Sequence, residues 1–403
     1  MSMSKSPALL LGFTIPDAVA RPIFAADPLP AVQTHNFAWS LAHALGSAHD
    51  RIYLLSTDPV QNYPLVPQKW FAARSFVENG IEGRTIAFAN LMILKHLTRF
   101  ISCLAALPQI RRWQIHSIYI HGVHSPFLLF GALLALFGYR VVPVLTDPPG
   151  IILPTDGKIS TLLKRVDRKI TRALIRRTTA IVALAPELAR PFADTLPVLV
   201  VPGILNGRWV ERIQSFGKAR IQSPPGKRPV VLYAGGLVAA YGVDRLIDAA
   251  TLLPDIDFLF YGKGNQVVRL ENSAAPNISY RGFANSAQLA EAMRDASILI
   301  NPRPSNADFA VQSFPSKLIE YLATGRTVLT TRIRSIPSDL ANCFDYIDDE
   351  TPAGIADAIQ RALIKPESKH DVLAHIEALY GEQAVGAWLA ALANDRTPRG
   401  SFS

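Results

Sequence analysis

The stretch FPSKLIEYLATGRTVLT, from Phe314 to Thr330, holds the clearest helix–strand unit in this 403-residue chain. Pro315 and Gly325 bracket an amphipathic segment, and these two residue types are typical of helix starts and helix ends. The apolar and β-branched run Thr327–Thr331 follows at once and predicts a buried strand. Glu320, inside the helix, carries a carboxylate suited to a sugar or ribose hydroxyl. The stretch predicts an α/β fold and indicates where a nucleotide would bind.

Strand and helix signals alternate along the whole chain. Strands are predicted at Ala8–Gly12, Ile52–Ser56, Ser117–His121, Arg140–Thr146, Ala180–Ala185, Val198–Val201, Pro229–Tyr233, Asp257–Tyr261, Ile298–Asn301 and Thr327–Thr331. Helices are predicted between them, among others at Asn36–Leu45, Ile86–Leu107, Lys158–Thr178, Val243–Leu253, Ser286–Asp295, Ser316–Ala323 and Gly354–Leu363. This alternation is typical of parallel sheets covered by helices on both faces.

The series is interrupted once, near the middle of the chain. The segment SFGKARIQSPPGKRP is polar, basic and rich in proline and glycine, which is typical of a linker. We therefore predict an N-terminal domain at residues 1–205, a linker at residues 206–228 and a C-terminal domain at residues 229–375. The last predicted helix, residues 376–395, is expected to pack back on the first domain. The expected fold class is α/β, with two doubly wound, Rossmann-like parallel-sheet domains facing a cleft.

Composition argues against a membrane-spanning or secreted protein. Hydrophobic residues make up 49% of the chain, but no uncharged apolar run reaches the length that a membrane span needs. Pro126–Gly138 is too short and predicts a buried helix, and Ile86–Leu107 is interrupted by charged residues. The N-terminus is a poor signal peptide. The two cysteines, Cys103 and Cys343, lie far apart and fit a reducing cytoplasm.

The formal net charge of +9 suggests an anionic partner. Much of the positive charge lies in Lys158–Arg177, where one predicted helical face is apolar and the other is basic. Such a helix is either a membrane-surface element or an ordinary core-packing helix with a solvated basic face. Nucleic acid is a poor explanation, because basic and aromatic residues do not interleave and no nucleic-acid-binding module is recognised.

Special residues follow successive strands in the second half. In open parallel sheets, ligands bind outside the carboxyl ends of the strands. The residues in question are Gly235 and Gly236, then Lys263 in a Gly-Lys-Gly turn, then Arg303, and finally Ser316 and Lys317 at a helix start. Glycine amides and helix N-termini are both suited to phosphate. Taken singly, a glycine pair is more often a tight turn and a lysine is more often solvated, so the prediction rests on their joint occurrence.

From Val230 to about Thr331 the chain resembles the donor-binding domain of the family-4-type retaining glycosyltransferases, which have the GT-B fold. The resemblance is carried by YAGGLVAAYGVDRLIDAA, FLFYGKGNQ, ISYRGF, LINPRPS and QSFPSKLIEYLATGRTVLTT. The variant with FPSK before the acidic residue is similar to bacterial enzymes that build cell-surface polysaccharides. The first domain resembles the family only in architecture.

The resemblance implies roles for particular residues. Glu320 matches the second glutamate of the family's Glu-x7-Glu motif, which binds the ribose hydroxyls. Gln312 stands where the first glutamate usually contacts the donor sugar. The remaining implied donor contacts are Gly235 and Gly236 under the diphosphate, Arg281 and Phe283 against the nucleobase, and Phe314 and Ser316 at the start of the Glu320 helix.

The chain departs from the family at three positions. Gly236 replaces an arginine and Tyr241 replaces a lysine, and both of those cations normally contact the diphosphate. Gln312 replaces a glutamate, and an amide can hydrogen-bond a sugar but cannot act as a base. Other cations must then stabilise the diphosphate, and the local candidates are Lys317, Arg303 and Lys263. We expect no cofactor and no obligatory metal.

The first domain offers two candidates for the catalytic site, Asp147 and His124. Each follows a predicted strand at the edge that would face the cleft. The family often has a histidine that faces the donor sugar from this domain. A lone histidine or aspartate at such a position more often has a purely structural role, and that alternative stays open for both residues.

The resemblance implies a hexosyltransferase-type enzyme that transfers a sugar from a nucleotide-sugar donor to a saccharide acceptor with retention of configuration. Basic charge on the first domain fits a lipid-linked acceptor and a cytoplasmic protein on the inner face of the plasma membrane. Two alternatives stay open: a sugar-nucleotide epimerase or phosphorylase on the same fold, and a GT-B-like binding subunit that has lost catalysis.

Overall fold

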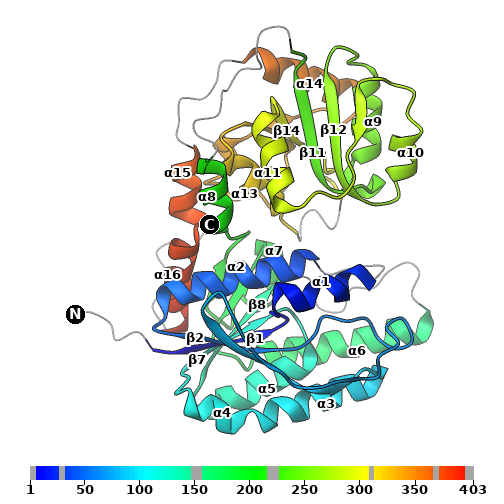
Figure 1. Cartoon of the computed structure of the whole chain (residues 1–403). Coiled ribbons are helices and arrows are strands. Elements are labelled where there is room, and N and C mark those ends of the chain that lie inside the picture. Colours follow the sequence, from blue (N-terminus) through cyan, green and yellow to red (C-terminus); the bar gives the residue numbers. More distant parts are fainter. Residues whose placement is uncertain are drawn as a thin grey trace. The chain divides into compact units, whose positions relative to one another are not determined.

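The computed structural model describes residues 6–26, 32–146, 157–215, 227–307, 313–365 and 372–394 (Figure 1). The chain divides into two compact units. The first comprises the chain up to Ile204 together with the segment from Glu382, and the second runs from Leu205 to Gly381. Each unit is built on a sheet of mainly parallel strands with helices on both faces, so the predicted α/β class is confirmed.

In the described residues, the first unit is built on an eight-stranded sheet with the order β10-β9-β8-β7-β1-β2-β5-β4. All neighbours pair in parallel except β4 and β5. The strands are β1 (Ala8–Gly12), β2 (Ile52–Ser56), β4 (Ser75–Glu78), β5 (Ile81–Thr85), β7 (Ser117–His121), β8 (Arg140–Leu145), β9 (Ile181–Ala183) and β10 (Val198–Val200). A separate antiparallel pair joins β3 (Trp70–Phe71) to β6 (Phe88–Ala89).

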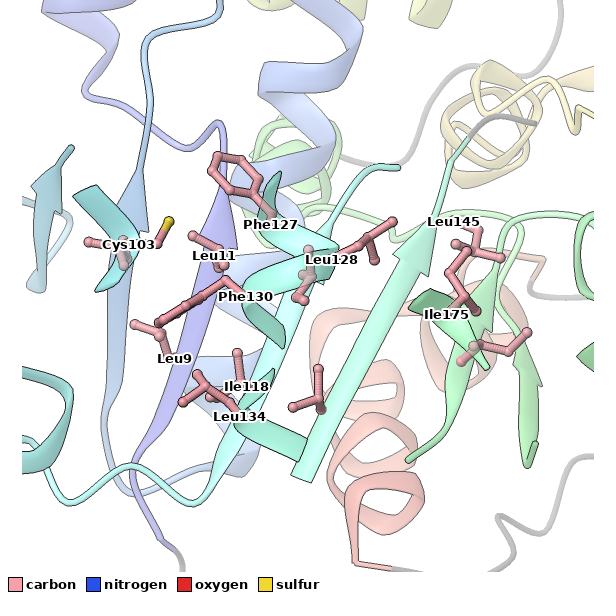
Figure 2. Close-up of a cluster of buried hydrophobic side chains, with 14 of the residues drawn as sticks. Leu9, Leu11, Cys103, Ile118, Phe127, Leu128, Phe130, Leu134, Leu145 and Ile175 are labelled. Carbon is pink, nitrogen blue, oxygen red and sulfur yellow. The ribbon is translucent and has the colours of Figure 1, made fainter. Parts of the chain in front are cut away.

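The helices of the first unit are α1 (Asp17–Ala26), α2 (Val32–Ala48), α3 (Met92–Ala105), α4 (Leu107–Arg112), α5 (Ser125–Leu136), α6 (Lys158–Ile175), α7 (Pro186–Ala189) and α16 (Glu382–Ala393), with a 3₁₀ turn at Arg190–Phe192. Helices α2 and α16 cover one face of the sheet, and α3, α4 and α5 cover the other. In Figure 2, Phe127, Phe130 and Leu134 of α5 lie over Leu9 and Ile118 of the sheet. Each such buried side chain contributes about 1.5–3 kcal/mol.

The second unit contains, in its described part, a six-stranded and entirely parallel sheet with the order β13-β12-β11-β14-β15-β16. The strands are β11 (Val230–Gly236), β12 (Asp257–Lys263), β13 (Ile278–Tyr280), β14 (Ile298–Asn301), β15 (Thr327–Thr331) and β16 (Asp345–Ile347). The chain steps from β11 outward to β13 and then returns to β14 on the other side of β11. Such a reversal creates the crevice in which doubly wound sheets bind ligands.

The helices of the second unit are α8 (Gly207–Ser215), α9 (Val243–Thr251), α10 (Val267–Glu271), α11 (Ser286–Asp295), α13 (Lys317–Ala323), α14 (Pro352–Ile364) and α15 (Val372–Tyr380), with 3₁₀ turns at Ala239–Tyr241 and Ala341–Cys343. Helices α9, α10 and α14 pack on one face of the sheet, and α8, α11, α13 and α15 pack on the other (Figure 1).

The domain boundaries differ from the sequence-based prediction at both ends of the second unit. The predicted linker, residues 206–228, begins with helix α8, whose buried Trp209 and Val210 join the core of the second unit. The predicted single helix at residues 376–395 is two helices separated at Gly381. Helix α15 belongs to the second unit and α16 to the first. The linker was predicted from the polar segment that begins at Ser215, whereas Trp209 and Val210 give the preceding residues a buried apolar face.

Candidate functional site

The carboxyl ends of adjacent strands bring several predicted residues together in the second unit. Gly236, the last residue of β11, pairs in register with Lys263, the last residue of β12. The next loop joins the same edge, because the Gly262 amide donates to the Gly282 carbonyl at 2.9 Å. The predicted diphosphate and nucleobase segments therefore lie at one edge of the sheet.

Two glycines allow these loops to approach one another. Gly262 has φ +139°, and a Cβ there would lie 1.8 Å from the Gly235 carbonyl oxygen. Gly242 has φ +76°, and a Cβ there would lie 2.0 Å from the Pro302 carbonyl oxygen. A side chain is excluded at both positions by φ and by space. The floor of the site is therefore backbone, as close approach to a phosphate requires.

Arg303 provides a cation beside the two positions at which the family's usual cations are missing. Its guanidinium lies 4.9 Å from the centroid of the Tyr241 ring. That ring lies against Gly236, where a Cβ would be 2.9 Å from Tyr241 Cε2. Arg303 also donates to the Ser313 carbonyl at 3.0 Å, and burial lowers its pKa. The Arg303 guanidinium therefore lies beside Tyr241, whereas Lys263, which pairs in register with Gly236, has its ammonium near Phe283.

The predicted nucleobase segment presents an exposed aromatic ring. Phe283 is 63% exposed, and the Lys263 ammonium lies 5.4 Å from its ring centroid. Arg281 is exposed, and its backbone N–H donates to the Phe260 carbonyl at 2.9 Å, which fixes the start of the loop. An exposed ring beside a cation is suited to stacking with a planar base.

Helix α13 carries Glu320 and Lys317 on one face. Their side chains form an ion pair with Nζ and Oε2 2.5 Å apart, three residues apart in the helix. Both groups are only partly exposed. Lys317 was predicted to substitute for the missing diphosphate cations, but in the structure its charge is shared with Glu320. The carboxylate keeps acceptor capacity for hydroxyl groups, since one oxygen can accept more than one hydrogen bond.

Two residues that the sequence did not single out hold α13 in place. The buried Tyr321 hydroxyl accepts from the Ala234 amide at 2.8 Å and lies 3.1 Å from the Ala234 carbonyl, which ties the helix to β11. The Trp209 indole N–H of α8 donates to the Glu320 carbonyl at 3.4 Å. These contacts span 87 and 111 residues, so no local sequence pattern could have revealed them.

The remaining predicted residues of this segment differ in their accessibility. Phe314 is almost fully buried and packs in the core with Leu318, so its side chain is not available to a donor. Ser316 is exposed at the N-cap of α13, and its side chain makes no capping hydrogen bond. Gln312 and Asp147 lie outside the residues that the structure describes, and their catalytic roles stay predictions.

Comparison with protein families matches residues 228–365 to the model for glycosyl transferases group 1. We refer to residues 228–365 as the group 1 domain, after the family model that they match. The match begins just before β11 and ends with α14, so it contains the whole second sheet and every described donor-site candidate. It supports the assignment of the chain as a transferase. The match does not distinguish the family-4 subtype or the FPSK variant, which stay predictions.

Solved structures resemble the whole chain, beyond the group 1 domain. A sucrose-phosphate synthase from Thermosynechococcus elongatus is 13% identical with a TM-score of 0.64, and the alignment covers 97% of this chain and 98% of that one. Anabaena HepE in complex with UDP is 13% identical with a TM-score of 0.57, at 96% and 99% coverage. An α,α-trehalose-phosphate synthase (UDP-forming) from Burkholderia xenovorans, in complex with glucose-6-phosphate, is 12% identical with a TM-score of 0.59, at 96% and 98% coverage. These likenesses confirm the GT-B fold. No curated protein matches the chain by sequence.

Outside the group 1 domain, the structure places His124 at the N-cap of α5. Arg99 donates to His124 Nε2 at 2.9 Å, and the imidazole packs edge-on against Phe127. Burial, together with the nearby Arg99 charge, holds the pKa of His124 well below its usual range. The ring is therefore neutral with its Nε2 lone pair engaged, which favours a positioning or hydrogen-bonding role over that of a proton acceptor.

A buried charged network surrounds this histidine. Lys95 and Arg99 lie one helical turn apart in α3 and both point inward. Lys95 Nζ donates to the Val60 carbonyl at 2.7 Å, and burial with the Arg99 charge lowers its pKa to about 7. Asp58, fully buried after β2, pairs with Arg74 at 2.5 Å and has a pKa raised by burial. From the sequence, the charges in Ile86–Leu107 were used only as an argument against a membrane span. The i, i+4 spacing of Lys95 and Arg99 in an otherwise apolar helix could also have indicated that both side chains lie on one face.

Six of the fourteen buried side-chain polar atoms that lack a hydrogen-bond partner in the described structure lie at the carboxyl edge of the first sheet. They are Thr14 Oγ1, Ser56 Oγ, Thr57 Oγ1, Asp58 Oδ2 and both ring nitrogens of His121. Burial lowers the pKa of His121 to about 4. Buried polar groups are nearly always hydrogen-bonded in native structures, so this edge has unused capacity to bind a ligand or water.

The described residues contain no group of three or more His, Cys, Asp or Glu side chains arranged to hold a metal ion. None of the described helices combines the length and apolar character that crossing a membrane would require.

Proposed function

We propose that the protein is a glycosyltransferase that moves a sugar from a nucleotide-sugar donor to a saccharide acceptor with retention of configuration. One observation carries the proposal: the carboxyl edge of the group 1 domain joins a glycine backbone floor, the Arg303 guanidinium, the Glu320 carboxylate and an exposed aromatic ring. A nucleoside diphosphate needs these groups in this combination. Glu320 accepts hydrogen bonds from the ribose hydroxyls, and Phe283 and Arg281 lie against the base.

The diphosphate would lie over Gly235 and Gly236, with Arg303 beside it. As the bond between the sugar and the diphosphate breaks, negative charge develops on the leaving oxygen. Backbone amides and a fixed guanidinium stabilise that charge without reorganisation at the moment of reaction. The acceptor hydroxyl would then form the new bond on the same face of the sugar and pass its proton to the leaving diphosphate oxygen. Gln312 would hydrogen-bond the donor sugar through its amide. No step requires a metal ion or another cofactor in this scheme.

Known relatives of the fold support the choice of ligands. HepE was crystallised with UDP, and the Burkholderia synthase is UDP-forming and holds glucose-6-phosphate. For this chain we propose a lipid-linked saccharide acceptor in bacterial polysaccharide biosynthesis, bound by the first unit at the cytoplasmic membrane face. The basic helix Lys158–Arg177 would contact anionic lipid there.

A product assay tests the proposal. The protein is incubated with a panel of nucleotide sugars and membrane lipid extract, and products are identified by mass. A glycosylated lipid that depends on one donor supports the proposal. Donor binding without any product would favour a catalytically degenerate subunit. Epimerisation or phosphorolysis of a donor in the absence of acceptor would favour the other enzymatic alternative.

A further inference from the structure

Helix α6 turns its apolar stripe outward. Leu162, Leu163, Val166 and Ile170 are between 46% and 61% exposed. The face toward the protein carries instead the fully buried Thr171 and Ile175. Asp167 also faces inward, since its carboxylate accepts a hydrogen bond from the Ser125 hydroxyl at the start of α5. The apolar stripe that the sequence could assign to core packing therefore lies on the surface.

Helix α3 likewise has apolar side chains on its outward face. Met92, Leu94, Leu97 and Ile101 are between 46% and 60% exposed. The inward face carries the cations Lys95 and Arg99, which are almost fully buried, and only its C-terminal half adds core-packing residues, Phe100, Cys103 and Leu104. A surface helix of a globular protein normally shows the opposite arrangement, with apolar residues inside and charges outside. Core packing does not explain the outer face of α3.

Helix α5 lies between these two helices and contacts both. It adds Leu129, Leu136 and its C-cap residue Phe137, which are 43%, 70% and 73% exposed. Figure 1 shows α3, α5 and α6 side by side on one face of the first unit's sheet. Among the described residues, eleven of the nineteen exposed large apolar side chains belong to these three helices. Patches of this kind mark interaction surfaces.

The charge around this apolar surface indicates what kind of partner it binds. On α6 the exposed Arg165, Lys169 and Arg176 run along one border of the apolar stripe. Helices α3 to α6 contain one acidic residue, Asp167, and it faces inward. A second copy of this chain, docked symmetrically, would bring the basic border against itself. A lipid bilayer with anionic head groups complements both the apolar stripe and its basic border, because it has an apolar interior beneath a negatively charged surface.

We propose that α3, α5 and α6 form a membrane-docking face, which places their exposed aliphatic side chains between lipid acyl chains and the α6 cations at lipid phosphates. This inference rests on the membrane association proposed above and makes it more specific. That association was argued from the charge of one helix, whereas here an apolar surface formed by three helices inserts into the bilayer. The protein lies on the bilayer through this face and does not span it.

Vesicle flotation of the full chain tests the docking face, with no donor or acceptor present. The probes are phosphatidylcholine vesicles with and without phosphatidylglycerol. The wild type is expected to float with the mixed vesicles. The variant Leu162→Ser/Val166→Ser/Ile170→Ser should lose binding by about tenfold or more, because the three apolar contacts are removed. Arg165→Gln/Lys169→Gln should lose the preference for phosphatidylglycerol. The control Leu252→Ser/Val268→Ser, at exposed positions of the second unit, should bind like the wild type.

Three results would overturn the docking face: no flotation of the wild type with mixed vesicles, an equal loss in the control, or a wild-type dimer in sedimentation that the α6 triple variant dissociates. Calorimetry with nucleoside diphosphates on the same proteins separates this inference from the proposed function. The triple variant should bind nucleotide like the wild type. Nucleotide binding without flotation overturns the docking face alone, and flotation without nucleotide binding overturns the transferase proposal alone.

Discussion

At the scale of single residues, the proposed donor site depends on which cation would face the diphosphate. Lys317 is paired with Glu320 at 2.5 Å, whereas Arg303 lies beside Gly236 and Tyr241. The partly exposed pair on α13 contributes little to stability, since such pairs are worth about 0–1 kcal/mol. We propose instead a functional role for the pair, in which Lys317 orients the Glu320 carboxylate that we assign to the ribose.

Arg303→Met should weaken binding of a nucleoside diphosphate by about tenfold or more, since a hydrogen bond to a charged group contributes about 1.5–3 kcal/mol. Binding of the corresponding monophosphate should change less. Lys317→Met serves as the comparison and should have the smaller effect on the diphosphate. Competition calorimetry measures all three. A larger loss in Lys317→Met would transfer the diphosphate role to α13.

His121 should make the first unit sensitive to acid. Its folded pKa of about 4 lies below the unfolded value near 6.5, so the unfolded state binds more protons between these limits. Its stabilising contribution is present above pH 6.5 and is lost as the pH falls towards 4. From pH 7 to pH 5 the free energy of unfolding should fall by about 2 kcal/mol through this residue.

Denaturant unfolding of the wild type and of His121→Phe at both pH values measures this contribution. The variant cannot titrate in this range and should lose less stability on acidification than the wild type. An identical pH dependence in the two proteins would show that His121 is not the acid-sensitive group.

At the scale of helices and strands, the glycine floor can be tested by adding one methyl group. Gly262→Ala should destabilise the second unit by about 3 kcal/mol or more, because its Cβ would collide with the Gly235 carbonyl at a positive φ. Gly325→Ala is the matched control, with φ +71° and no atom within 4 Å of the added Cβ, and should cost about 1 kcal/mol. Thermal unfolding followed by circular dichroism compares the two. Equal destabilisation would mean that the floor can relax.

Buried strands could be predicted well from the sequence, and helix faces could not. The strands β1, β2, β7, β14 and β15 begin and end at the predicted residues. Continuous apolar runs specify a strand with both faces buried. Strands β13 and β16 were missed, because ISY and DYI are only three residues long and become strands by pairing at the sheet's edges. The orientation of α6 was also undetermined, since periodicity gives an apolar face but not the surface it contacts.

The proximity of the proposed donor-site residues was predictable to the extent that sheet topology alone determines it. Gly236 and Lys263 are in register because both end parallel strands, as the alternating pattern implied. Tyr321, Trp209 and the inward-facing Arg99 were not predictable, because their roles depend on contacts between segments distant in sequence.

At the scale of the whole molecule, the C-terminal helix α16 completes the first unit. Gly386 allows it to pack closely on α2, since a Cβ there would lie 2.0 Å from the Ala44 carbonyl oxygen. The Tyr119 hydroxyl also donates to the Leu389 carbonyl at 3.0 Å. The two units therefore have separate cores, although the chain leaves the first and returns to it.

Gly386→Val should destabilise the first unit and spare the second, because the added side chain forces α16 away from α2. Hydrogen-exchange mass spectrometry resolves the two responses. Peptides from Val32–Ala48 should exchange faster than in the wild type, and peptides from Val230–Gly236 should not. Uniform loss of protection over both units would show that they unfold as one.

The central claim is that the second sheet binds a nucleoside diphosphate through Glu320. Calorimetry with a panel of nucleoside diphosphates tests it on the wild type, on Glu320→Gln and on the control Glu291→Gln, which changes an exposed glutamate of α11. We expect one diphosphate to bind the wild type and the control alike and to bind Glu320→Gln about tenfold or more weakly, because the ribose hydroxyls lose a charged acceptor. Equal affinity in all three proteins, or no binding to the wild type, would contradict the claim.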